Sequence, residues 1–124
     1  MNTVLLNDPL TGSTAKIAVD LGFNCFEFLA SVGEDTISVI DSADGFADGG
    51  KPPSHSGIPL LFPFPNRIRE GRYSWNGVDY HLPESLVGYE GSGNAIHGFC
   101  LDRPWRILNQ TDSSVTGIFR ISQD

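Results

Sequence analysis

The sequence predicts an all-β protein of antiparallel strands, and three observations support this fold class. Apolar and polar residues alternate with a period of two in several short segments. An Asn-Gly pair at residues 76–77 joins two such segments, and this pair is the preferred sequence of a two-residue hairpin turn. No stretch of about a dozen residues sustains a helical period with start and stop signals, so no long helix is expected.

Three strands are predicted in the first third of the chain, at residues 14–19, 25–29 and 36–40. In each of them β-branched or aromatic residues recur at every second position, which is typical of a strand with one buried face. The segments 20–24 and 31–35 lie between these strands and contain Gly, Asp and Asn, which favour turns. The first third is therefore expected to form an antiparallel meander.

The most specific local prediction is a hairpin over residues 72–82. A type I′ turn needs positive φ at both central positions, which Asn76 and Gly77 tolerate. The two-residue loop fixes the pairing and places one set of side chains on an aromatic face: Tyr73, Trp75, Val78 and Tyr80. The polar face carries Arg72, Ser74, Asp79 and His81. We expect the aromatic face to be half-buried against a core.

The remaining segments are two loops and two strands. Residues 41–57 and 83–95 are rich in Gly, Pro, Ser and Asp, and long loops of this kind are often functional. Strands are predicted at 105–108 and 115–122, on either side of a polar turn. Since the chain is long enough for one core and no linker divides it, residues 1–124 are predicted to form a single β-sandwich domain or the N-terminal part of a larger one.

Composition excludes several classes of partner. Fifteen acidic and eight basic residues give a net charge of −7, which argues against binding nucleic acid or an anionic membrane. No apolar run is long enough to span a membrane, and the N-terminus lacks the basic and apolar regions of a secretory signal. We therefore expect Cys25 and Cys100 to be reduced thiols in a cytoplasmic protein.

Residues 57–68 form a proline-rich segment, Gly-Ile-Pro-Leu-Leu-Phe-Pro-Phe-Pro-Asn-Arg-Ile. Prolines cannot continue a helix and remove donors from a sheet, so this segment is stiff and irregular. It could act as a wall that holds the guanidinium of Arg67 toward a hydroxyl-rich or anionic ligand. The alternative is a structural corner, and from this segment alone the corner is the better interpretation.

A histidine lies in the second informative segment, residues 94–99. His97 stands between Ile96 and Gly98, which predicts a buried or half-buried imidazole that could bind a sugar hydroxyl or ring oxygen. The alternative is a core histidine bonded to a carbonyl group. His55 and His81 are expected at the surface. No zinc-ligand spacing or phosphate-binding loop is found, so neither a metal nor any other cofactor is predicted.

Aromatic side chains offer a further surface for sugar rings, although in a small β-domain such residues are more often core. The candidates are Phe62, Phe64, Tyr73, Trp75, Tyr80 and Trp105.

Taken in order, residues 57–68, the hairpin residues 71–82 and the run Ile96-His97-Gly98-Phe99 resemble the aldose 1-epimerase (galactose mutarotase) family. The resemblance is close over residues 57–108. It implies a galactose mutarotase-like antiparallel β-sandwich, of which this chain is apparently an incomplete, N-terminal portion. It also implies that Arg67 is the family's sugar-binding arginine and His97 the first of its two active-site histidines. Asn66 is expected beside them, bracing the loop more than touching sugar.

The implied activity is an isomerase that interconverts the α and β anomers of a free aldose by acid/base ring opening. The family's general acid histidine, in a His-Pro-Tyr-type motif, and its late general base glutamate have no counterpart in this chain. We therefore expect the chain to be inactive by itself, and the alternative is a non-catalytic carbohydrate-binding β-domain. The expected partners are a monosaccharide and either a second copy of the chain or a complementing C-terminal chain.

Overall fold

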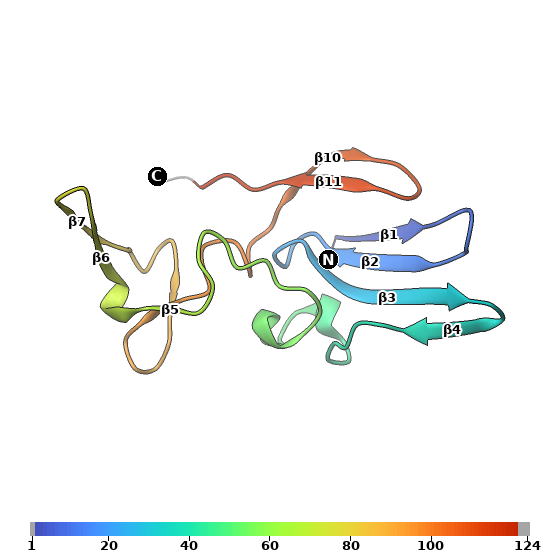
Figure 1. The fold of residues 1–124 in the computed structure, drawn as a ribbon, viewed down its shortest axis with the longest axis horizontal. Helices are drawn as coiled ribbons and strands as arrows, with labels where there is room; N and C mark the ends of the chain where they lie inside the picture. The colour runs from blue at the N-terminus through green and yellow to red at the C-terminus, as the bar shows by residue number, and fades with distance from the viewer. Residues whose placement is uncertain (1, 122–124) are drawn as a thin grey trace. The chain divides into compact units, whose positions relative to one another are not determined.

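The computed structural model describes residues 2–121, which divide into two compact units (Figure 1). The first unit runs to Leu60 and resumes over Leu101–Phe119, and the second consists of Leu61–Cys100 together with residues 120–121 of the described chain. Within residues 2–121 the regular structure consists of antiparallel β-strands and short 3-10 helices, which confirms the predicted all-β class. No helix in this part of the chain is long and apolar enough to cross a membrane. A single domain over 1–124 stays a prediction.

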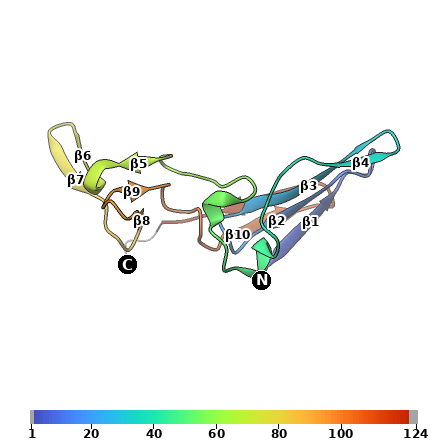
Figure 2. The ribbon, with the colours of Figure 1, turned by 90° about the horizontal axis from the view of Figure 1, so that it is seen from below.

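The first unit is built on a four-stranded antiparallel sheet whose strands follow one another in sequence order, as Figure 1 shows; Figure 2 gives the same strands seen from below. The strands are β1 (Thr3–Asn7), β2 (Thr14–Ala18), β3 (Asn24–Val32) and β4 (Asp35–Ser38). The three strands predicted in this region are present. Because β3 extends to Val32, which pairs with Asp35 of β4, the turn predicted at 31–35 is reduced to residues 33–34. The strand β1 was not predicted. It pairs with β2, with Val4 opposite Ile17.

A second layer covers this sheet within the first unit. It consists of β10 (Arg106–Gln110) and β11 (Val115–Ile118), which pair with each other. The buried side chains of Val4, Ile17 and Val19 form a core against which partly buried side chains of the second layer pack: Trp105, Ile107 and Val115. Alternation thus buries Val4 of β1 and Ile17 of β2 against this core. The expectation of a buried face is wrong for β4, whose residues are all exposed, including Ile37 at 48%. The strand predicted at 115–122 ends earlier, at Ile118, and its last residue lies outside the described residues.

The long loop 41–57 is anchored to the first unit by a buried asparagine. It contains two short 3-10 helices, η1 (Phe46–Asp48) and η2 (Pro53–His55). Asn24, which is fully buried, donates from Nδ2 to the carbonyl of Ser56 at 2.9 Å and accepts from the backbone N–H of Ile58 at 3.0 Å. Because a buried amide must find partners, these hydrogen bonds fix where the loop ends and the proline-rich segment begins.

The second unit contains a three-stranded sheet and a separate hairpin. The sheet has the order β5-β9-β8, and the hairpin pairs β6 with β7. The element bounds are β5 (Arg67–Ile68), η3 (Arg69–Gly71), β6 (Arg72–Trp75), β7 (Val78–His81), β8 (Gly88–Tyr89) and β9 (Ala95–Ile96). The core of this unit consists of Leu82, Val87 and Ala95, and Phe64 and Phe99 pack against it.

The hairpin has the predicted register but not the predicted burial. Tyr73 pairs with Tyr80 and Trp75 with Val78, and the two tyrosine rings stack with centroids 5.0 Å apart. Trp75 is 67% exposed, however, and the other side chains of the aromatic face are exposed as well. The expectation that this face is half-buried is therefore wrong. Turn chemistry fixes which residues pair, whereas burial depends on what covers the face, and the core of this unit gathers around Leu82 instead.

Candidate functional site

The two segments singled out in the sequence lie side by side in the second unit. β5 pairs antiparallel with β9, so Arg67 stands opposite Ile96. Beyond this ladder the backbone N–H of His97 donates to the carbonyl oxygen of Asn66 at 2.9 Å, and that of Phe99 donates to Phe62 at 2.7 Å. The structure therefore brings Asn66, Arg67 and His97 together through the backbone.

Local sequence explains this arrangement. Pro63 and Pro65 have no N–H group, so the strand ladder can begin only after them, at Arg67. Gly98 has a φ of 73° and lies so close to the backbone of Phe62 that a Cβ atom would overlap its carbonyl group. Only glycine fits this close approach of the two backbones.

His97 has an unusual backbone conformation and a ring nitrogen without a partner. Its φ of 67° is uncommon for a residue other than glycine. The residue is half-buried, as predicted, and its Nδ1 atom is buried without a hydrogen-bond partner among the described residues. Buried polar atoms are nearly always paired, so this nitrogen lacks the carbonyl partner that a structural core histidine would have.

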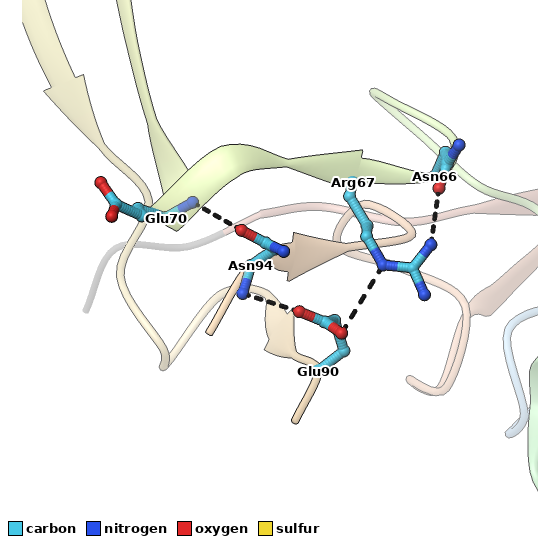
Figure 3. Close-up of polar contacts among 5 residues, drawn as sticks. All are labelled: Asn66, Arg67, Glu70, Glu90 and Asn94. Carbon is cyan, nitrogen blue, oxygen red and sulfur yellow. Dashed lines mark hydrogen bonds and ion pairs between the residues drawn. The ribbon is translucent and has the colours of Figure 1, made fainter. Parts of the chain in front are cut away.

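The guanidinium of Arg67 lies between two acceptors, as Figure 3 shows. Its Nη1 donates to the side-chain oxygen of Asn66 at 3.1 Å, and its Nε is 3.6 Å from a carboxylate oxygen of Glu90. About half of the Arg67 side chain is exposed (52%), so the remaining guanidinium N–H groups are accessible to a ligand. The side chain of Asn66 thus contacts Arg67, while its expected role in bracing the loop stays a prediction.

Glu90 and Asn94 complete this cluster, and sequence reasoning did not assign them to it. The backbone N–H of Asn94 donates to Oε1 of Glu90 at 3.0 Å, and the side-chain oxygen of Asn94 accepts from the backbone N–H of Glu70 at 3.0 Å (Figure 3). The backbone hydrogen bond from Asn94, followed by the one from Ser92 and by the positive charge of Arg67, holds the pKa of Glu90 below its ordinary value. Glu90 is therefore ionised where it faces the guanidinium.

The other candidate residues lie elsewhere. His55 is exposed in η2, and His81 is exposed on β7 with Nε2 3.4 Å from the hydroxyl of Tyr89. Neither Cys25, which is half-buried, nor Cys100, which is buried, belongs to a disulfide. Trp105 belongs to the core of the first unit. Within residues 2–121 no group of three or more His, Cys, Asp or Glu side chains is placed to hold a metal ion.

The donors of this cluster suit a polyhydroxylated ligand. An arginine fixed at two of its nitrogens presents its other N–H groups in a defined direction, and each of them can donate to a hydroxyl oxygen. An imidazole can both donate and accept, which matches the same property of a hydroxyl group.

Comparison with known proteins adds to this geometry. A sequence model of the family described as aldose 1-epimerase matches residues 31–124. The chain is 42% identical over 65 residues to the uncharacterized protein YihR of Escherichia coli (strain K12). It is also similar to the crystal structure of a galactose mutarotase-like protein from Clostridium acetobutylicum, with 25% identity and a TM-score of 0.73 over 92% of this chain.

The chain covers only part of these relatives. The matched segment spans 52% of this chain and 20% of YihR, and the structural match spans 34% of the Clostridium protein.

Proposed function

The chain belongs to the aldose 1-epimerase family, and we propose that it contributes Arg67 and His97 to a site that interconverts the α and β anomers of a free aldose. One observation carries this proposal beyond family membership. The backbone pairing of β5 with β9 sets His97 next to Asn66, so an arginine with free donors adjoins a histidine with an unpartnered buried nitrogen.

The proposed reaction moves two protons on a hemiacetal. A base removes the proton of the C1 hydroxyl while an acid protonates the ring oxygen, so the C1–O bond to the ring breaks and an aldehyde forms. The aldehyde carbon then turns about its bond to C2, and closure on its other face gives the second anomer. In this scheme Arg67 donates hydrogen bonds to sugar hydroxyls, and His97 hydrogen-bonds the ring oxygen or a neighbouring hydroxyl.

We propose that the general acid and base come from outside these 124 residues. The sequence contains no His-Pro-Tyr motif. Glu90 is unsuited to be the base because its carboxylate is already committed to Asn94 and Arg67, and its lowered pKa weakens it as a proton acceptor. A second histidine and a glutamate would be supplied by further residues of the same protein or by a complementing chain.

Polarimetry and calorimetry test this proposal together. The purified 124-residue chain should bind D-galactose or D-glucose saturably and should not accelerate the mutarotation of the α anomer beyond the buffer rate. The variant Arg67→Ala should lose binding, while Arg72→Ala, which removes an arginine from the exposed hairpin, should retain it.

Two results would contradict the proposal. If the chain accelerated mutarotation and the variant Arg67→Ala did so equally well, the site would lie elsewhere. A protein that also contains a His-Pro-Tyr motif and a late glutamate should accelerate mutarotation. If such a protein bound the aldose saturably without accelerating its mutarotation, a non-catalytic carbohydrate-binding domain would be favoured.

A further inference from the structure

We propose that Glu90 is the positioning residue of the sugar site: its carboxylate holds the guanidinium of Arg67 in the orientation that binds sugar hydroxyls. This inference rests on the proposed function. Glu90 acts through Arg67 and does not itself touch the sugar.

The carboxylate of Glu90 is itself fixed, which is the first requirement for a positioning residue. Its two oxygens have separate partners, because Oε1 accepts from the backbone N–H of Asn94 while Oε2 faces Nε of Arg67 (Figure 3). The loop that carries Glu90 is closed by two backbone hydrogen bonds, from Glu90 to Asn94 at 2.9 Å and from Gly93 to Glu90 at 2.8 Å. Glu90 is also shielded, since only 19% of its side chain is exposed.

The same loop is tied to the strand that carries Arg67. The side-chain oxygen of Asn94 accepts from the backbone N–H of Glu70, which follows β5 in η3. At its other end β5 adjoins Asn66, whose carbonyl accepts from His97. The segment from Asn94 to His97 is therefore joined to the chain on both sides of Arg67, by one side-chain and one backbone hydrogen bond. These contacts hold the loop that carries Glu90 beside Arg67.

The two contacts also leave one guanidinium nitrogen of Arg67 available to a ligand. Asn66 engages Nη1 and Glu90 faces Nε, while Nη2 has no partner among the described residues. A long arginine side chain is costly to order when a ligand binds. Because the two contacts order the Arg67 side chain before the ligand binds, less conformational entropy is lost on binding.

The test is a double-mutant cycle on the affinity for D-galactose, measured by calorimetry. Glu90→Gln retains an oxygen that can accept from Asn94 but loses the charge that faces Arg67. We expect it to weaken binding about tenfold in the unaltered background. In an Arg67→Ala background the same change should have no further effect, because Glu90 acts through Arg67. Glu84→Gln, which alters an exposed glutamate, serves as the matched control and should bind like the unaltered protein.

A second measurement does not depend on sugar. The Nε–H proton of Arg67, observed by NMR, should exchange slowly with water in the unaltered protein and faster in Glu90→Gln, while the amide resonance of Asn94 stays in place. Equal exchange in both proteins, or an equal loss of affinity with and without Arg67, would overturn the positioning role. If the unaltered protein bound no aldose, the proposed function would fail, and the Arg67 signal would still decide whether Glu90 holds the guanidinium.

Discussion

Replacing Gly98 with alanine should break the contact that holds the two site segments together. Gly98 has a φ of 73°, and a Cβ atom built on it would overlap the carbonyl oxygen of Phe62 and lie 2.9 Å from the nitrogen of Phe62. These are backbone atoms, so they cannot move aside as a flexible side chain would. The overlap lies next to the hydrogen bond from Phe99 to Phe62, which aligns the proline-rich segment with the histidine segment.

The expected cost has two parts. A residue other than glycine in the left-handed region costs about 1–2 kcal/mol. Forcing an extra methyl group against packed atoms costs about 1–3 kcal/mol more. Gly98→Ala should therefore lower the free energy of unfolding by about 2–5 kcal/mol. Gly93→Ala is the matched control, because Gly93 has a φ of 85° and no atom within 4 Å of a built Cβ, so only the first part applies.

The assay combines urea unfolding with amide hydrogen exchange. The exchange rate of the Phe99 amide reports directly on the hydrogen bond to Phe62, and it should rise in Gly98→Ala and stay unchanged in Gly93→Ala. Equal stability of the two variants, with Phe99 equally protected, would refute the argument that the close approach of Gly98 aligns the segments.

Three further predictions concern stability. Asn24→Ala should lower the free energy of unfolding by about 2–4 kcal/mol in urea titrations, because it leaves the carbonyl of buried Ser56 without the donor Nδ2 of Asn24. Leu82→Ala should cost about 2–5 kcal/mol by the same measurement, because Leu82 is only 8% exposed in the core of the second unit. The hydroxyl of Thr11 and backbone amides lower the pKa of Asp8 from 3.8. Asp8 should therefore stabilise the fold above pH 3.8 and less at lower pH, and Asp8→Asn should flatten that acid dependence of the urea midpoint.

Local signals in the sequence predicted the elements that depend on local chemistry. The Asn76-Gly77 turn fixed the hairpin register, and alternation identified β2, β3 and β4. The strand β1 escaped because Leu5 is apolar yet 57% exposed, which hides the alternation of Val4 with its neighbours. The strands β5, β8 and β9 have two residues each, too few to show any period, and only long-range pairing defines them.

The candidate site was also predictable only in part, because local motifs can be recognised in a sequence whereas long-range pairing cannot. Motif order pointed to Asn66, Arg67 and His97, and the backbone pairing places them together. Glu90 gave no such signal, because its contact with Arg67 depends on the long-range pairing of β9 with both β5 and β8. Its turn-forming neighbours, Gly91-Ser92-Gly93, indicate a loop but not what the loop faces.

The central claim is that Arg67 and His97 form one aldose site, and an NMR titration of the His97 imidazole with D-galactose tests it most directly. The account predicts that the Nδ1 resonance of His97 shifts saturably with sugar in the unaltered protein and in Arg72→Ala, and that Arg67→Ala abolishes the shift. Saturable sugar binding that leaves the His97 resonance unmoved, or that persists with unchanged affinity in Arg67→Ala, would contradict it.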